Sequence, residues 1–334
     1  MPSSKTPRTF CVASVGSIAL LLSSTSLAQQ QPIQAQGFSV ERLYGSAPGA
    51  GWLVMDDLRM QGELGGVVAL TTGYAHDPLR VTDGTNRLSV VSDQAFADFG
   101  FAGTYDRWRA YLNMRVPLAV EGQGGTVGNY VFGSPGVDPG SNPDTLSDVR
   151  LGLDARVFGH DGDPLRLGAG AQLFVANGNV VGGNRANYDT DGTVRAMGRV
   201  LAAGDFGRIV YAGQLGVHIR PLDDSSTPGS PQGTELLFGV ASGLRTDLGA
   251  QGFGTLIVGP ELFGATAFRS VFGTNTTAFE GLMTGRYESP SDSGPQIRMK
   301  LGIGAGIDQH FGAPEWRTVF AIELLDHTQR RTPK

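Results

Sequence analysis

The stretch RWRAYLNMRVPLA, from Arg107 to Ala119, decides the fold class because its polar and apolar side chains alternate. Three arginines, a tyrosine and an asparagine stand at every second position, and Trp108, Ala110, Leu112, Met114 and Val116 fill the gaps. A period of two is typical of a β-strand with one polar and one apolar face. Three arginines are many for a face that meets water, so the surroundings of both faces need an explanation.

The same alternation recurs along the chain in segments of about ten residues, separated by turns rich in Gly, Asp, Asn and Pro. The 50 glycines among 334 residues argue against long helices. We predict twelve strands, namely Leu58–Ala75, Leu88–Tyr105, Arg107–Ala119, Ser147–Phe158, Leu165–Val175, Thr193–Ala202, Ile209–Arg220, Thr234–Arg245, Gly252–Phe263, Ala278–Tyr287, Gln296–Ile307 and Glu315–Leu325.

Two features favour a membrane barrel over a soluble sandwich, which would also alternate. The polar faces carry Arg, Asp, Glu, Gln and Gly, as expected where charged side chains pair across a narrow lumen. Every second connection is long, at 76–87, 119–146, 176–192, 221–233 and 264–277. Outer-membrane barrels have short periplasmic turns and longer outer loops in this alternation. We therefore predict an all-β, antiparallel transmembrane barrel of about twelve strands, with both termini on the periplasmic side.

The N-terminus has the pattern of a secretory signal peptide over residues 1–28. Lys5 and Arg8 precede the apolar run Phe10–Leu22, and small residues stand before Gln29. Cleavage after Ala28 would remove Cys11, the single cysteine of the chain. We divide the remainder into a flexible leader (29–48), the barrel (49–325) and a basic tail (326–334), and we expect the protein in the outer membrane of a Gram-negative cell.

Four stretches resemble a known family: FSVERLYGSAPGAGWLVMDDLRMQGEL, VVSDQAFADFGFAGTYDRWRAYLNMRVPLA, GPELFG and GIGAGIDQHFGAPEWRTVFAIEL. They are similar to the N-terminal barrel domain of large outer-membrane proteins of the OmpA family, over residues 38–325. In that family, acidic calcium-binding repeats and a peptidoglycan-binding domain typically follow the barrel. The 334 residues contain neither, so the resemblance implies the barrel and not a role in binding the cell wall.

The inward face is the candidate functional surface, because an arginine facing lipid at the membrane midplane costs about 2–4 kcal/mol. The candidate lumen-lining charges are Arg107, Arg109, Arg115, Asp148, Arg150, Asp154, Arg156, Arg166, Arg195, Arg199, Arg220, Glu235, Arg245, Glu261, Glu280, Arg286, Arg298, Lys300, Arg317 and Glu323, with Asp98 also inward. These charges could line a pore that selects small anions, since basic residues outnumber acidic ones. They could equally form a salt-bridge network that fills a narrow lumen.

Two further patterns in the sequence concern metal binding and catalysis. The loop NYDTDGT places Asn187, Asp189, Asp191 and Gly192 at the first positions of a calcium loop. Gly198 stands where such a loop needs its Glu, so we predict a surface turn and no metal site. The chain contains no G-x-S-x-G motif, and none of its five histidines lies beside a serine motif. We therefore predict no enzyme, no catalytic residues and no cofactor.

From these observations we predict a small passive pore for polar or anionic solutes. The alternative is a structural or surface-binding barrel whose lumen is plugged by salt bridges, with the 119–146 loop as the binding surface. The expected partners are outer-membrane lipid, the barrel-assembly machinery and small polar or anionic solutes. A mildly acidic chain without a concentrated basic patch is not expected to bind nucleic acid.

Overall fold

The computed structural model describes residues 32–60, 64–135, 147–176, 181–182, 185–222, 233–249, 253–290, 294–308 and 312–327. The predicted signal peptide and nearly all of the basic tail lie outside these residues. None of the helices in the described part of the chain is long and apolar enough to cross a membrane.

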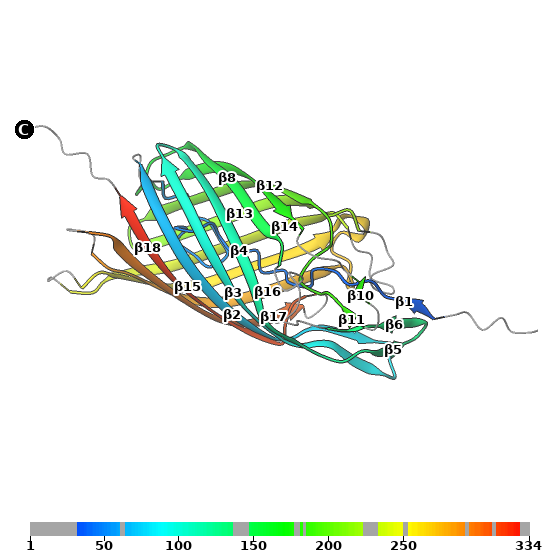
Figure 1. Ribbon diagram of the computed structural model, residues 1–334. Helices are drawn as coiled ribbons and strands as arrows, with labels where there is room; N and C mark the ends of the chain where they lie inside the picture. The colour runs from blue at the N-terminus through cyan, green and yellow to red at the C-terminus, as the bar shows by residue number, and fades with distance from the viewer. Residues whose placement is uncertain are drawn as a thin grey trace, which may run out of the picture. The chain divides into compact units, whose positions relative to one another are not determined.

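Twelve antiparallel strands close into a barrel in which each strand pairs with its neighbours in sequence, and the last pairs with the first (Figure 1). The wall consists of β2 (Gly65–Thr82), β3 (Arg87–Tyr105), β4 (Trp108–Glu121), β8 (Val149–Phe158), β9 (Arg166–Val175), β12 (Arg195–Phe206), β13 (Ile209–Ile219), β14 (Glu235–Asp247), β15 (Thr255–Ala267), β16 (Thr277–Glu288), β17 (Gln296–Asp308) and β18 (Trp316–His327). The predicted fold class is confirmed.

The alternation on β4 shows how the sequence orients the wall. Trp108 and Met114 are 49% and 38% exposed on the outside, whereas Arg109 is 1% exposed on the inside. Large apolar residues cover the outer face of the other strands as well, including Leu151, Val200 and Val240. A barrel with an apolar exterior and a polar interior is the arrangement required for a closed sheet in lipid.

The two ends of the barrel differ in their connections, as predicted. At the short-turn end lie the connections 106–107, 159–165, 207–208, 248–254 and 289–295. At the long-connection end lie 122–148, 176–194, 220–234, 268–276 and 309–315, together with the β2–β3 hairpin. That hairpin differs from the expected loop at 76–87, because β2 continues to Thr82 and only four residues connect it to β3.

The first strand begins later than predicted, because the residues before it lie inside the barrel. Residues 35–60, here called the lumen segment, run through the barrel as irregular chain (Figure 1). Phe38, Trp52 and Met55 are at most 1% exposed. The predicted flexible leader (29–48) is therefore wrong for its described part: these residues have no alternation of their own, yet they are held by contacts with the wall.

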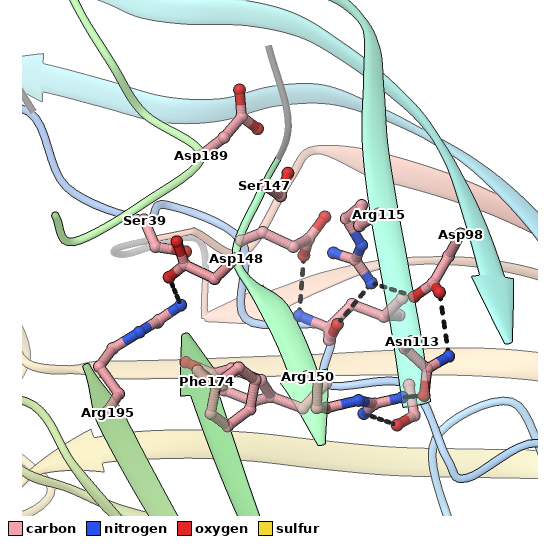
Figure 2. A pocket seen from close by; sticks show the side chains of 14 residues that line it. Ser39, Asp98, Asn113, Arg115, Ser147, Asp148, Arg150, Phe174, Asp189 and Arg195 are labelled. Carbon is pink, nitrogen blue, oxygen red and sulfur yellow. Dashed lines mark hydrogen bonds and ion pairs between the residues drawn. The ribbon is translucent and has the colours of Figure 1, made fainter. Parts of the chain in front are cut away.

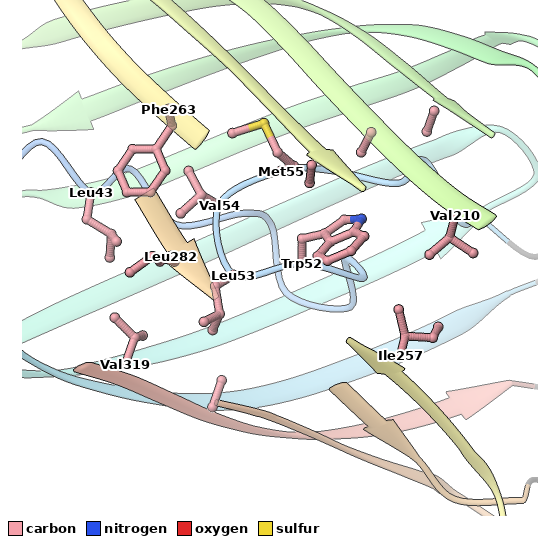
Figure 3. Packing of buried hydrophobic residues seen from close by; sticks show 14 of the residues in the cluster. Leu43, Trp52, Leu53, Val54, Met55, Val210, Ile257, Phe263, Leu282 and Val319 are labelled. Atoms are coloured by element: carbon pink, nitrogen blue, oxygen red, sulfur yellow. The ribbon is translucent and has the colours of Figure 1, made fainter. Parts of the chain in front are cut away.

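Four successive residues of the lumen segment pack into the main apolar cluster of the barrel. Trp52, Leu53, Val54 and Met55 pack against small and apolar inward residues of the wall, including Phe263, Leu282 and Val319 (Figure 3). Gly51 permits a close approach here, because a Cβ on it would lie 1.7 Å from Nη1 of Arg286 and 2.0 Å from the Asp57 carboxylate. A side chain at position 51 would therefore displace the charged groups around it.

A second apolar cluster caps the long-connection end. It joins Ala35, Phe38 and Val40 of the lumen segment to the β2–β3 hairpin and to Phe132 and Tyr188 of the long connections. Short strands support it: β1 (Ile33–Gln34) pairs with β6 (Tyr130–Phe132), which pairs with β5 (Gly125–Val127), while β7 (Ser134–Pro135) pairs with β11 (Arg185–Ala186) and β11 with β10 (Val181–Gly182). One 3₁₀ turn, η2 (Phe268–Ser270), lies in another connection.

The position of β1 corrects the prediction that both ends of the chain lie on one side. The backbone N–H of Ile33 donates to the Asn129 carbonyl at 2.8 Å, so the described chain starts at the long-connection end. It then crosses the whole lumen to reach Gly65 at the short-turn end, where β2 begins and β18 finishes.

Candidate functional site

The candidate site is the contact between the lumen segment and the charged inner wall. Its centre is Glu261, on β15, whose carboxylate accepts the backbone N–H groups of Leu53, Val54 and Met55 at 2.9, 2.8 and 3.0 Å. The Thr284 hydroxyl donates to the same carboxylate at 2.7 Å. Three successive N–H groups form an anion-binding concavity, and hydrogen bonds to a charged acceptor are among the strongest. Glu261 therefore holds the irregular backbone of the segment at mid-barrel.

A second contact is a buried group of ion pairs between two wall arginines and two aspartates, one on the wall and one on the segment. Arg109 of β4 binds Asp56 of the segment and also Asp154 of β8, the latter at 2.8 Å. Arg199 of β12 lies 3.0 Å from Asp154 and 3.6 Å from Asp56. All four side chains are at most 4% exposed. Removing one member of such a buried network leaves an uncompensated charge, at a cost of about 3–5 kcal/mol.

Arg59 holds the segment at the short-turn end. Its guanidinium lies 3.2 Å from Asp57, 3.6 Å from Asp205 and 3.3 Å from Glu288. Asp205 and Glu288 stand near the ends of β12 and β16, so one arginine of the segment joins two distant strands of the wall.

At the long-connection end the segment is bound through Glu41, Arg42 and Ser39. Glu41 lies 2.8 Å from Arg317, which also binds Glu280 at 2.9 Å. Arg42 lies 3.0 Å from Glu235. The backbone N–H of Ser39 donates to Asp191 at 2.8 Å. The segment is thus fixed by charged contacts at both ends and by Glu261 in the middle.

Asp191 and Asp189 lie in the NYDTDGT loop, which the sequence predicts as a surface turn. The structure corrects this, because Asp191 is 2% exposed and binds Arg220 at 2.7 Å and Arg195 at 3.3 Å. Burial alone would raise the pKa of Asp191, but Arg220 and Arg195 outweigh it and hold that pKa below its usual value. In the described part of the chain no arginine forms an ion pair with Asp189. Burial raises its pKa to about 6, although a hydrogen bond of 2.7 Å from Gln94 and the charge of Arg115 oppose the rise.

The space left between the segment and the wall is small. One cavity has a volume of about 50 Å³ and is bordered by Asp98, Arg115, Asp148, Arg150 and Arg195. Figure 2 shows how these side chains lie around it. Two further cavities along the segment measure about 20 Å³ each. Volumes of this size hold a few water molecules at most. Along the middle of the segment and at its long-connection end, the described lumen therefore offers room for water and not for a solute. A larger cavity of about 310 Å³ opens at the short-turn end, bordered by Arg59, Asp205 and Glu288.

Arg150 differs from the other lumen arginines in Figure 2, because no carboxylate pairs with it in the described part of the chain. Its guanidinium instead donates to the backbone carbonyls of Gly45 and Ser46 and, at 2.8 Å, to Asn113. Lys300 similarly donates to the Ala50 carbonyl at 3.0 Å. Backbone carbonyls of the lumen segment thus serve as partners for cations of the wall.

The structure brings most of the predicted residues together inside the lumen. Those buried there are Arg109, Asp148, Arg150, Asp154, Arg156, Arg166, Arg195, Arg199, Arg220, Glu235, Glu261, Glu280, Arg286, Arg298, Lys300, Arg317 and Glu323, with Asp98. Arg115 and Arg245 are partly accessible, at 18% and 27%. Arg107 is 59% exposed beside Asp106, because it lies in the turn before β4. Its placement in the lumen is the one incorrect assignment among these residues.

Sequence reasoning missed the charges of the lumen segment, Glu41, Arg42, Asp56, Asp57 and Arg59. Their signal is faint but present: acidic and basic residues stand among Leu, Val, Met and Trp in a stretch with neither helical nor strand period. It also missed Asp205 and Glu288, which continue the inward phase of β12 and β16 beyond the predicted strand ends.

Comparison with known proteins places the fold. No protein-family model and no curated protein matches the chain. Among solved structures, the chain is similar to the COG4313 outer membrane channel from Pseudomonas putida F1, with a TM-score of 0.50 and 12% identity over 81% of this chain and 98% of that one. It also matches OmpT of Vibrio cholerae, with a TM-score of 0.32 and 15% identity over 78% of this chain and 98% of that one. An anion-selective porin from Comamonas acidovorans matches with a TM-score of 0.31 and 12% identity over 78% of this chain and 98% of that one. The first likeness supports an outer-membrane barrel fold.

Proposed function

We propose that this protein is an outer-membrane barrel closed by its own lumen segment, and that it passes small anionic solutes only when the segment leaves the lumen. The observation that carries the proposal is the clamp of Glu261 on three successive N–H groups of the segment. An open passive pore would not need a wall carboxylate buried against an internal backbone. The proposal therefore joins the two alternatives drawn from the sequence, with the plug as the resting state.

The preference for anions follows from what the wall would expose without the segment. Basic residues outnumber acidic ones on the inward face of the described strands. Arg150 would lose its carbonyl partners, and Lys300 would lose two acceptors, the carbonyls of Ala50 and Trp52. Guanidinium and ammonium groups that lose hydrogen-bond partners in a narrow lumen attract anions and repel cations.

Orientation in the membrane follows from the two kinds of connection. Outer-membrane barrels place short turns in the periplasm and long connections outside. The cap that joins the lumen segment to the long connections would then face the exterior. We also retain, as part of the proposal, that the chain is the barrel domain of an OmpA-family protein, exported by the signal peptide over residues 1–28 and inserted by the barrel-assembly machinery.

A purely structural or surface-binding barrel is the second candidate. The cap favours it, because the apolar cluster around Phe38, Phe132 and Tyr188 closes the long-connection end independently of the clamp. In that case the segment would never leave, and the outer connections would carry the function.

Planar-bilayer recording separates the candidates, using the purified protein and a variant that lacks residues 35–60. We expect the wild type to be silent, and the deletion variant to give stable steps with a reversal potential that shows anion preference in a salt gradient. Steady conductance of the wild type would contradict the plug. A deletion variant that is silent, although it is folded by gel heat-shift, would favour the structural barrel.

A further inference from the structure

A histidine, an aspartate and a glutamate side chain meet at the long-connection end of the seam where the barrel closes. His76 and Asp77 belong to β2, the first strand, and Glu315 directly precedes β18, the last strand. Trp316 pairs with His76 in the ladder, and the Glu315 N–H donates to the His76 carbonyl at 2.9 Å. One ligand atom from each of the three side chains lies within 4.8 Å of the other two.

A β-bulge makes this cluster possible. Neighbouring residues of a regular strand point to opposite faces, so His76 and Asp77 could not otherwise share a site. The ladder between β2 and β3 shifts its register between His76 and Leu79, and Asp77 has a φ of 50° in the left-handed region. Bulges re-aim side chains in this way. Here the bulge brings the imidazole and the carboxylate to the same side, facing Glu315.

Each potential ligand is oriented by a second group. Nδ1 of His76 lies 3.1 Å from Asp93, which leaves Nε2 with its lone pair for a metal. Ser89 donates its hydroxyl to Asp77, and Arg80 donates to Oε1 of Glu315. A carboxylate that holds the second nitrogen of a ligating histidine is a recurrent feature of metal sites. The cluster therefore has an organised second layer as well as a donor set.

We propose that His76, Asp77 and Glu315 form a site for a divalent transition-metal cation, best matched by Zn²⁺. One imidazole nitrogen and two carboxylate oxygens suit Zn²⁺, with water in the remaining position. The His76 and Glu315 side chains are 36% and 38% exposed, so the ion reaches them from solvent. Bound there, the metal clips the first barrel strand to the last. The site does not depend on whether the lumen segment moves.

A competing cation in this cluster is Arg87, whose side chain is 61% exposed. Its Nη2 lies 3.3 Å from Oε1 of Glu315 and 3.8 Å from Oδ2 of Asp77. A metal ion has to displace this guanidinium, whereas Arg80 can stay on Oε1 of Glu315 while the other carboxylate oxygen binds the ion. Arg87 should therefore weaken metal binding, and its removal should strengthen it.

Isothermal titration of the purified full chain with Zn²⁺ tests the site. We expect one ion per chain, at least tenfold weaker binding for His76→Ala, and about 10–100-fold weaker binding for Asp93→Asn, which alters only the orienting group. Arg87→Ala should bind more tightly than the wild type. His160→Ala is the matched control, because His160 is 89% exposed beside Asp163 at the short-turn end and should leave binding unchanged.

Folding of each variant is checked by its gel heat-shift. Two results would overturn the proposal: no Zn²⁺ binding by either the wild type or Arg87→Ala, or binding that is the same in folded His76→Ala as in the wild type. The increase in Zn²⁺ affinity expected for Arg87→Ala keeps the test decisive even if the His76→Ala variant folds poorly.

Discussion

Replacing Glu261 with alanine should loosen the hold of the wall on the lumen segment. The substitution removes the acceptor of three buried backbone N–H groups and of the Thr284 hydroxyl. A buried donor left without an acceptor costs about 1–3 kcal/mol. Water can enter the space left by the side chain, so we take the lower end and expect about 3 kcal/mol for the three N–H groups together. That free energy shifts an equilibrium between bound and released segment by roughly a hundredfold.

The assay is single-channel recording of the purified variant in planar bilayers. We expect Glu261→Ala to open in brief steps that the wild type does not show. Asp98→Asn is the matched control, because within the described part of the chain the polar contacts of this carboxylate are with wall residues, Asn113 at 2.9 Å and Arg115 at 3.7 Å. A folded Glu261→Ala that is as silent as the wild type would refute the reasoning, as would equal opening of Asp98→Asn.

Three further predictions concern stability, measured as the free energy of unfolding by urea in lipid vesicles. Asp189 has a pKa of about 6 in the folded state against 3.8 when unfolded, so its contribution to stability is greatest below pH 3.8 and is lost as the pH rises through about 6. The loss is at most about 3 kcal/mol, and smaller because the side chain is only half-buried. Asp189→Asn should remove it, and a pH profile of stability that the substitution leaves unchanged would contradict this. Leu151→Arg, on the outer face, should cost about 2–4 kcal/mol, whereas a soluble barrel would tolerate it. Arg109→Met should cost about 3 kcal/mol, the lower end for breaking a buried ion pair, because Asp56 and Asp154 are left to share Arg199. The double variant Arg109→Met/Asp56→Asn should recover part of that loss.

The wall could be predicted from the sequence because its signal is local. A period of two places Arg109 inside and Trp108 outside within the same two residues, and this assignment holds on every strand. Arg107 is the exception, because the alternation continues into the turn while the strand begins at Trp108. A strand ends where its hydrogen bonds to the neighbouring strands end, and the alternation within one strand does not predict that position.

The lumen segment could not be predicted from the sequence because its order depends on partners far along the chain. Leu53 and Glu261 are 208 residues apart, and the segment makes no ladder of its own across the lumen. Gly45, Gly49 and Gly51, which let it bend inside the barrel, give the sequence the composition of a flexible leader. For the same reason the Asn- and Asp-rich turn at 187–192 resembles a surface loop, although Asp191 is buried against Arg220.

Disulfide cross-linking between the lumen segment and the wall tests the central claim most directly. A Cβ built on Gly49 lies 3.8 Å from Cβ of Val67 on β2, which is the separation found in disulfides. Gly49 has a φ of 84°, so a cysteine there strains the backbone by about 1–2 kcal/mol, which the surrounding contacts should tolerate. Cys11 is replaced by serine so that no other thiol competes.

The control pair is Ala69→Cys with Gly100→Cys, whose Cβ positions lie 3.4 Å apart on the neighbouring wall strands β2 and β3. The new Cβ at position 100 also lies 2.7 Å from Cγ of Pro48, so the ring of Pro48 has to shift in this control. We predict that Gly49→Cys/Val67→Cys and the control pair both form the disulfide on oxidation of the folded protein. The contradicting result is a disulfide in the control pair and none in Gly49→Cys/Val67→Cys. It would show that the segment lies outside the lumen.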